Sequence, residues 1–185
     1  MKLVKTSDFG IKGINYYWSR QDKFNLSEEE LKSVGVTGNY AWVDERLIPH
    51  LKDANEAFKK HGYEIIVKDG YRSPEQYQMV KEKRYALDGK ENTDKTFNPV
   101  RMPHSTGLTV DINLISLKTG REIEIWDKKD WPDGIFVGFY RNKTDNKSKS
   151  YQKLQDLLIN TMLDLGFKLG VKNEIWHFEY PLNPK

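Results

Sequence analysis

The sequence contains no cysteine, which excludes disulfide bonds, thiolate metal sites and thiol nucleophiles together. Any metal ion must therefore be bound by nitrogen and oxygen atoms. The sequence also lacks a run of about 18 apolar residues, the length expected of a membrane-spanning helix. Its amino end, from Met1 to Asp8, has no apolar stretch that resembles a signal peptide. We expect a cytoplasmic protein, or an exported one whose signal has been removed.

Charge of one sign is not concentrated in any part of the chain. The formal net charge is +3, and the 30 lysines and arginines are dispersed among 27 acidic residues. Nucleic-acid-binding proteins usually carry a concentrated basic face, so we expect no nucleic acid partner. With 185 residues and no internal repeat, residues 1–185 are expected to form one domain with a core of ordinary size. The sequence does not indicate the oligomeric state.

Hydrophobic periodicity predicts a mixture of helices and strands. Expected helices are a short one capped by Ser27, one over residues 49–60, one that begins at Pro74 after a capping Ser73, and one over residues 150–165. Expected strands cover residues 63–68, 108–115, 121–125 after a turn at 119–120, and 175–180, while residues 87–101 are expected to be a loop. Because strands and helices do not alternate strictly, the predicted fold class is α+β, with a largely antiparallel sheet flanked by helices.

The segment from His104 to Asp111 carries two side chains that can bind a metal ion. Gly107 between them permits a tight turn, and the alternation over residues 108–115 places Asp111 on the polar face of a strand. A loop histidine and a strand aspartate can then converge on one point. The alternative is a histidine in a surface turn and an aspartate bonded to nearby main chain.

A second pair, Glu174 and His177, lies near the carboxyl end. Two imidazoles and one carboxylate leave the fourth tetrahedral position of a catalytic zinc open for water, and a further carboxylate can take that water's proton. Side chains three positions apart on a regular strand point to opposite faces. Glu174 and His177 can therefore share a site only if the chain bends there, or if Glu174 precedes the regular strand. The alternative is an aromatic core strand that contains a hydrogen-bonded histidine.

Arg72 lies between a predicted strand and a predicted helix, a position where loops often carry functional side chains. A cation close to a catalytic metal can stabilise the oxyanion that develops as water attacks a carbonyl group. The alternative is a structural arginine that caps a helix or pairs with a carboxylate. Position in the sequence does not separate these two roles.

The three motifs occur in the order Asp69-Gly-Tyr-Arg72, His104-x-x-Gly107-x-x-x-Asp111 and Glu174-x-Trp-His177. This order closely resembles the D-alanyl-D-alanine dipeptidases of the vancomycin-resistance type, zinc D,D-peptidases that share a fold with the hedgehog signalling domain. The resemblance covers roughly residues 40–180 and implies the same hedgehog-like fold, with residues 1–38 as an N-terminal extension packed on it. Three separated motifs in the right order are more specific than any one of them.

The resemblance implies one zinc ion per chain, bound by His104, Asp111 and His177. It also implies that Glu174 is the general base and later the proton donor, and that Arg72 steadies the tetrahedral intermediate. The family uses an acidic residue after the hairpin to hold the ammonium group of the substrate. Counted without gaps from the turn at residues 119–120, this role falls on Asp130.

Two positions depart from the family pattern. Met102 stands where the family usually has serine, and Thr109 stands where it has alanine. Neither change removes a metal ligand. The loss of the serine hydroxyl near the substrate pocket argues against strict specificity for a dipeptide.

The leading functional hypothesis is hydrolysis of the free D-alanyl-D-alanine dipeptide, a small D-amino-acid peptide. Its closest rival is a D,D-carboxypeptidase or endopeptidase that acts on peptidoglycan stem peptides with the same metal chemistry. A third hypothesis is a non-catalytic binding module that keeps zinc for its structure. Glu174 and Arg72 argue against this third hypothesis, because a purely structural metal site needs no general base.

Overall fold

The fold is built on a five-stranded sheet with the strand order β2-β4-β5-β7-β6, as seen in a computed structural model that describes residues 1–97 and 100–182. The strands are β2 (Lys12–Gly13), β4 (Tyr63–Asp69), β5 (Thr109–Ser116), β6 (Lys168–Leu169) and β7 (His177–Glu179). β2 runs parallel to β4, whereas the other neighbouring pairs are antiparallel. The predicted α+β class with a largely antiparallel sheet is confirmed.

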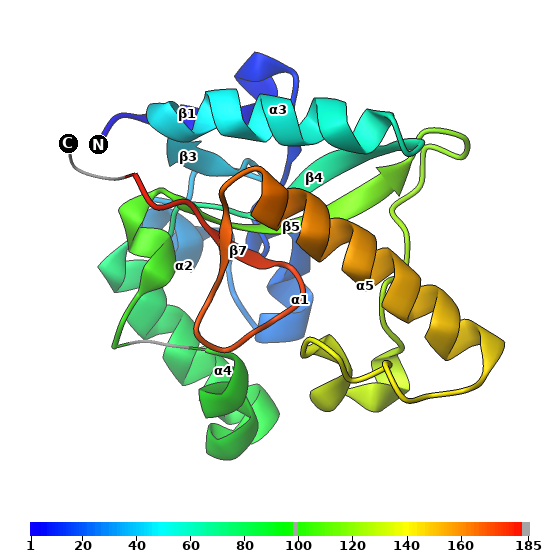
Figure 1. Cartoon of the computed structure of the whole chain (residues 1–185). Coiled ribbons are helices and arrows are strands. Elements are labelled where there is room, and N and C mark those ends of the chain that lie inside the picture. Colours follow the sequence, from blue (N-terminus) through cyan, green and yellow to red (C-terminus); the bar gives the residue numbers. More distant parts are fainter. Residues whose placement is uncertain (98–99, 183–185) are drawn as a thin grey trace.

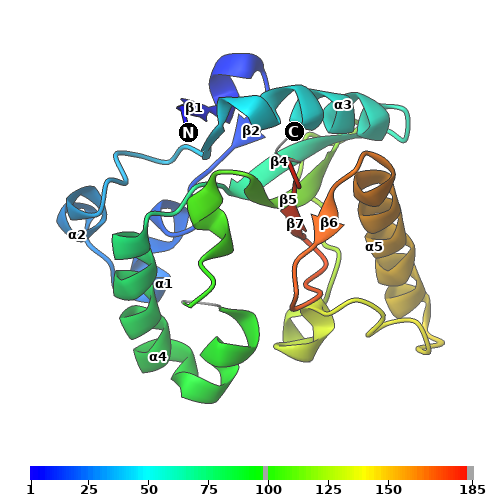
Figure 2. The same ribbon diagram turned by 60° about the vertical axis from the view of Figure 1, so that its left-hand side comes forward.

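Helices flank this sheet (Figure 1). Helix α3 (Ile48–Lys59) packs against β4, and α5 (Asn146–Asp164) packs against α3 and β6. Helix α4 (Pro74–Thr96) extends away from the sheet on the side opposite α3, next to the short helix α1 (Gln21–Phe24) (Figure 2). Within residues 1–97 and 100–182, none of the helices combines the length and apolar character that a membrane span requires.

The main hydrophobic core lies between the sheet, α3 and α5. On β5 the side chains of Val110, Ile112 and Leu114 are completely buried, and they alternate with the half-buried Asp111 and Asn113. This is the alternation that the sequence predicts, and it directs Asp111 away from the core. The sheet therefore holds a carboxylate in a fixed position on its polar face.

The N-terminal stretch takes part in both sheets of the molecule. Strand β1 (Leu3–Lys5) pairs antiparallel with β3 (Trp42–Asp44), and β2 extends the edge of the main sheet at β4. Helix α2 (Glu28–Ser33) begins with the predicted capping box, in which Ser27 and Glu30 satisfy each other's main-chain N–H groups. A second apolar cluster joins this stretch to α4; its buried members are Tyr17, Phe24, Leu26, Leu31, Val36, Tyr77, Val80 and Phe97.

Short 3-10 helices occupy the connections. They are η1 (Thr6–Phe9), η2 (Trp18–Arg20), η3 (Glu45–Leu47), η4 (Pro103–Thr106), η5 (Lys128–Asp130) and η6 (Asp133–Ile135). Two of them contain residues that the sequence singles out for function: His104 lies on η4, and Asp130 is the last residue of η5.

The predicted loop over residues 87–101 is wrong over most of its length. Helix α4 begins at Pro74, where Ser73 caps it as predicted, and continues to Thr96 with a break at Gly89, whose φ is 75°. The polar residues after the break are stabilised as a helix by the i,i+4 ion pairs Lys90–Asp94 and Glu91–Lys95. The sequence contains no apolar stripe there, so periodicity gave no sign of a helix. Residues 98 and 99 lie outside the described residues.

Two other boundaries differ from the prediction. The turn at residues 119–120 forms, but the predicted strand over 121–125 is reduced to an isolated bridge between Glu122 and Ile115. Helix α5 begins one turn earlier than expected, because Asp145 accepts a hydrogen bond from the main chain of Ser148 and caps it. The last strand is also shorter than predicted, and this shortening changes the functional site.

Candidate metal centre and cleft

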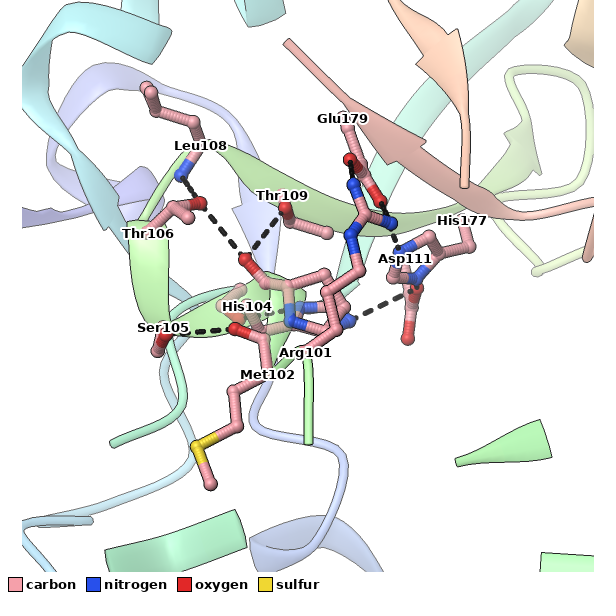
Figure 3. A network of polar contacts seen from close by, with 12 residues as sticks. Arg101, Met102, His104, Ser105, Thr106, Leu108, Thr109, Asp111, His177 and Glu179 are labelled. Atoms are coloured by element: carbon pink, nitrogen blue, oxygen red, sulfur yellow. Dashed lines mark hydrogen bonds and ion pairs between the residues drawn. The ribbon is translucent and has the colours of Figure 1, made fainter. Parts of the chain in front are cut away.

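Three separated segments bring His104, Asp111 and His177 together (Figure 3). His104 lies on η4, Asp111 is on β5, and His177 is the first residue of β7. One potential ligand atom from each side chain lies within 4.8 Å of the other two. The residues that the sequence predicts as a ligand set therefore form one cluster.

Sheet pairing fixes two members of this cluster. Asp111 and His177 are directly opposite each other in the antiparallel β5–β7 pair, and His177 Nδ1 lies 2.9 Å from Asp111 Oδ1. Directly opposed residues on antiparallel strands project from the same face of the sheet. The distance between these two ligands is thus set by the main chain.

The orientation of His104 follows from its contacts with main chain and with Tyr77. Its Nδ1 lies 2.8 Å from the carbonyl oxygen of Gly70, and its main-chain N–H donates to the Tyr77 hydroxyl at 3.0 Å. Because a carbonyl oxygen only accepts, Nδ1 must carry the proton, and the lone pair is on Nε2. Nε2 lies 3.6 Å from Asp111 Oδ1, so it faces the cluster.

His177 has a partner that sequence reasoning missed. Its Nε2 lies 3.6 Å from a carboxylate oxygen of Glu179, which also accepts two hydrogen bonds from Arg101, at 2.7 and 2.6 Å. A carboxylate behind a metal-binding imidazole orients the ring and raises its basicity. The available signal was the spacing of two positions on one strand, which places Glu179 and His177 on the same face.

Gly170 lies directly behind the His177 ring. A Cβ atom at this position would lie 2.3 Å from Cδ2 and 2.9 Å from Nε2 of His177, much closer than van der Waals contact. Only glycine lets the main chain approach the imidazole so closely. The His177 ring is thereby confined between Gly170 on one side and Asp111 on the other.

Glu174 reaches the same site because the chain bends before β7. His177 N–H donates to the Glu174 carbonyl oxygen at 3.2 Å, and residues 175 and 176 form a turn, so Glu174 precedes the strand. This resolves the spacing problem that a regular strand would create. Glu174 is 8% exposed and lines the same cleft as the three potential ligands.

The pKa values of the two carboxyl groups in the site, those of Glu174 and Asp111, are shifted in opposite directions. Burial and the nearby Asp111 raise the pKa of Glu174 to about 7, although His177, Arg84 and Lys172 act in the opposite direction. Burial also opposes ionisation of Asp111, yet the two imidazoles hold its pKa far below the ordinary value. Glu174 is therefore suited to exchange protons near neutral pH, whereas Asp111 remains an anionic ligand.

Arg72 is held by one carboxylate and three rings. It forms an ion pair with Asp69, and its guanidinium carbon lies 4.5 to 5.3 Å from the ring centres of Tyr77, Tyr17 and Phe97. Its main-chain N–H donates to the carbonyl oxygen of His104 at 3.3 Å, which ties it to the metal cluster. Arg72 is 5% exposed and lines the cleft.

Asp130 is not among the residues that line the cleft. Its carboxylate accepts a hydrogen bond from the Tyr140 hydroxyl at 2.8 Å and lies 3.5 Å from the ammonium group of Lys143. These contacts hold Asp130 within the segment that contains η5 and η6. The predicted role in binding a substrate ammonium group therefore has no support from the position of Asp130.

The cleft that contains the cluster has a volume of about 840 Å³. One side is formed by residues from η2, α1 and α4 together with Phe97, and the other side by residues 122–131. Residues of β4 and β5 form its base, and Figure 2 shows α4 and the segment after β5 extending from the same side of the sheet. The metal cluster is therefore one corner of a much larger space.

The donor set of this corner fits a zinc ion. Two imidazoles and a carboxylate are ligands that zinc accepts, and they leave a position open toward the cleft. The lone pair of His104 Nε2 and the carboxylate of Asp111 both face the common point. The histidines are also fixed from behind by Gly70 and Glu179, as expected of metal-binding imidazoles.

Comparison with known proteins supports the resemblance noted from the motifs. No family model matches the chain. A D-alanyl-D-alanine carboxypeptidase of Enterococcus faecalis (strain ATCC 700802 / V583) is 26% identical over 150 residues, which cover 75% of this chain and 48% of that protein. The chain thus spans about half the length of the curated relative it matches.

Solved structures that match the chain are of the same kind. A mutant of the vancomycin resistance D,D-pentapeptidase VanY in complex with Zn(II) has 24% identity and a TM-score of 0.43, over 76% of this chain and 73% of that chain. The D,D-dipeptidase VanXYg in complex with a D-Ala-D-Ala phosphinate analog has 17% identity and a TM-score of 0.46, over 99% and 68%. The LdcB LD-carboxypeptidase has 21% identity and a TM-score of 0.46, over 75% and 59%.

Proposed function

We propose that the protein is a zinc-dependent peptidase that hydrolyses the bond between the two residues of a D-alanyl-D-alanine terminus. The observation that carries this proposal is the position of Glu174 beside the cluster of His104, Asp111 and His177, in one cleft. A structural metal site has no use for a buried carboxylate with a pKa of about 7 next to an open coordination position. The similarity to a D-alanyl-D-alanine carboxypeptidase supports the substrate class.

Each of the proposed site residues has a separate task. His104, Asp111 and His177 would hold a zinc ion, which would supply a Lewis acid and a water whose pKa is lowered to about 7. Glu174 accepts a proton and passes it to the departing amine. Arg72 stabilises the negative charge that develops on the carbonyl oxygen. Its aromatic surroundings exclude water, which strengthens this electrostatic effect.

We infer that the preferred substrate is longer than a dipeptide, in the manner of a carboxypeptidase. A cleft of about 840 Å³ has room for several residues, whereas a free dipeptide needs a closed pocket and an acid for its ammonium group. The acid proposed for that purpose, Asp130, is engaged by Tyr140 and Lys143 outside the cleft lining. The rival, hydrolysis of the free dipeptide, is favoured by the motif resemblance and remains the second candidate.

The decisive experiment is the comparison of wild type with Glu174→Gln. We expect the variant to fold, to bind one zinc ion per chain as measured by elemental analysis, and to lose hydrolysis of an acyl-D-alanyl-D-alanine peptide by several orders of magnitude. Glu124→Gln is a matched control, because Glu124 lines the same cleft but is exposed and outside the metal corner. It should retain activity.

The same assay separates the substrate candidates. The wild-type protein should release D-alanine from an acylated pentapeptide much faster than it cleaves the free dipeptide. Turnover of the dipeptide alone would reject the carboxypeptidase proposal. Full activity in Glu174→Gln would remove Glu174 from the mechanism, and a zinc-binding wild type without any hydrolysis would leave the non-catalytic module as the correct hypothesis.

A further inference from the structure

The α4 side of the cleft collects cations that have no carboxylate partner among the described residues. Arg20 on η2, Lys23 on α1 and Lys172 in the loop before β7 all line the cleft, and none of them forms an ion pair within residues 1–97 and 100–182. Lys172 donates only to the carbonyl oxygen of Asp94, on the second half of α4. Like charges gathered at one surface repel one another unless an anion lies among them.

Arg84 is a buried cation on the same side of the cleft, and it forms an ion pair with Asp88 on its own helix. It is 9% exposed and lines the cleft from α4, where it donates to Thr96 Oγ1 at 2.7 Å and interacts with the Tyr17 hydroxyl. Its Nε is buried and has no acceptor, and the nearest carboxylate, Asp88, lies at 3.7 Å, beyond hydrogen-bond distance. A guanidinium group has five donors in a fixed fork, so Arg84 keeps donor capacity, at Nε in particular, that its recorded partners do not use. An oxygen anion in the cleft would use it.

The separation of Arg84 from Arg72 can be bounded through a ring that both guanidinium groups contact. The guanidinium carbons of Arg72 and Arg84 lie 5.3 and 5.4 Å from the centre of the same Phe97 ring. The guanidinium groups of Arg72 and Arg84 are therefore separated by no more than the length of about three residues of extended peptide, since each residue spans about 3.3–3.6 Å. Arg84 and Lys172 are also the cations that act electrostatically on Glu174 besides His177. A peptide bound at the metal corner would reach both of them.

We propose that Arg84 and Lys172 bind a carboxylate that the substrate peptide carries within three residues of the bond that is cleaved. The inference rests on the proposed function and adds to it that the preferred peptide is acidic on the side that faces α4. A carboxylate matches the guanidinium fork, and Lys172 supplies a second positive charge from the loop before β7. Arg20 and Lys23 at the rim attract the anion without contacting it closely.

Binding of matched peptides tests this proposal without relying on turnover. The protein is zinc-loaded Glu174→Gln, and the readout is the fluorescence of Trp126, Trp131 and Trp176, which line the cleft. The ligands are acylated peptides that end in D-alanyl-D-alanine and carry either glutamate or glutamine at the second or third residue before the bond. At one of these positions we expect the glutamate peptide to bind about 10- to 100-fold more tightly, as for a charge-assisted hydrogen bond.

Variants then assign this preference to residues. Adding Arg84→Gln should reduce the ratio of the two affinities to nearly one, and adding Lys172→Gln should reduce it several-fold. Lys128→Gln removes an equal charge from the opposite side of the cleft and should leave the ratio unchanged. Thr96→Val removes the hydrogen bond that joins Arg84 to the end of α4 without removing charge, and it too should keep the preference.

Three results would overturn the proposal. They are equal binding of the glutamate and glutamine peptides at both positions, no measurable binding of any of them, and a preference that survives both Arg84→Gln and Lys172→Gln. If Arg84→Gln does not fold, the Lys172→Gln result decides alone, because this side chain lies at the surface of the cleft. Failure of the proposed function would appear separately, as absence of hydrolysis by the wild-type protein.

Discussion

Two regions of the cleft hold their charged groups by different means. They are the metal corner, with His104, Asp111 and His177, and the arginine side, with Arg72 and the aromatic rings around it. In the metal corner, strand pairing sets the distance from Asp111 to His177, and the Gly70 carbonyl group orients His104. On the arginine side, Arg72 is held by the rings of Tyr17, Tyr77 and Phe97. Main-chain contacts position the first group of residues, and packed side chains position the second.

Because the two regions are held differently, we expect them to respond differently to loss of the metal ion and to substitution of a side chain. In the metal corner, Asp111 and His177 are part of the sheet, and His104 is held by main-chain contacts of η4 and Gly70. The arginine side depends on Tyr17 from the N-terminal stretch and on Tyr77 from α4, which meet in the second apolar cluster. We therefore expect the metal corner to tolerate loss of its ion, and the arginine side to respond to the loss of a single ring.

The largest effect should come from removal of the metal. Chelation of the purified protein should lower hydrolysis of an acyl-D-alanyl-D-alanine peptide by at least about 10³-fold, because the Lewis acid and its activated water are both lost. Activity should return in proportion to added zinc, up to one ion per chain. Circular dichroism should remain unchanged, since the sheet holds Asp111 and His177 and main-chain contacts hold His104. Unfolding on chelation, or activity without metal, would contradict this account.

A smaller effect is expected from Gly170→Ala. The new methyl group would lie within 2.3 Å of His177 Cδ2 and must displace the ring from its position against Asp111. We expect zinc affinity to fall about 10- to 100-fold, as when a group that orients a ligand is removed. Competition with a fluorescent chelator measures it. Val171→Ala, at a neighbouring side chain that is 68% exposed, is the control. Unchanged zinc affinity in Gly170→Ala would show that His177 can move and still bind zinc, so main-chain contacts would not fix the ring as argued above.

On the arginine side, Tyr17→Leu should separate catalysis from metal binding. Loss of one ring from the cage around Arg72 should lower kcat about tenfold, consistent with about 1–2 kcal/mol for a buried cation–π contact, while zinc affinity is unchanged. Tyr17→Phe keeps the ring and should retain most of the activity. If both substitutions lower zinc affinity instead, the two regions are not independent.

The same contrast explains which parts of the site the sequence predicts. His104, Asp111 and His177 were predictable because their spacing follows from a turn and from the alternation of a strand, which are local rules. The bend that brings Glu174 beside His177 was recognised as necessary, but its cause lies in tertiary contacts, including the bridge to Phe136. Local rules identified the residues, and tertiary structure supplied their geometry.

The residues that sequence reasoning missed depend on contacts between distant segments. Tyr17 contacts Arg72 from a stretch that resembles no known motif, and Gly170 matters only because His177 packs on it. Asp130 was assigned by counting without gaps from a turn, and its role in binding an ammonium group stays a prediction. The chain after that turn forms only an isolated bridge, between Ile115 and Glu122, instead of the predicted strand. The helical second half of α4 has no apolar stripe, and it was predicted as loop for that reason.

The smallest predicted effect concerns Asp44, which supports the metal corner from behind. Its main-chain N–H donates to the Gly107 carbonyl oxygen at 2.9 Å, and its buried carboxylate accepts three hydrogen bonds from Arg46. The side-chain hydrogen bonds from Arg46 hold the pKa of Asp44 below its ordinary value, although burial opposes them. A depressed pKa stabilises the fold above the unfolded value of about 3.9, and this contribution is lost as the pH falls toward the folded value.

Denaturant unfolding of wild type and Asp44→Asn at two pH values tests this contribution. At pH 7 the variant should be less stable by about 1 kcal/mol, a modest figure because Arg46 is largely exposed and solvent screens its charge. As the pH falls below the unfolded value of about 3.9, the difference should shrink, since the wild-type carboxylate then loses its charge as well. Because every other titrating group is common to both proteins, the change in the difference reports Asp44 alone. A difference that stays constant from pH 7 to pH 3 would mean that Asp44 acts through its hydrogen-bond geometry rather than its charge, and the support behind the metal corner would then be main-chain in nature, as in the rest of that region.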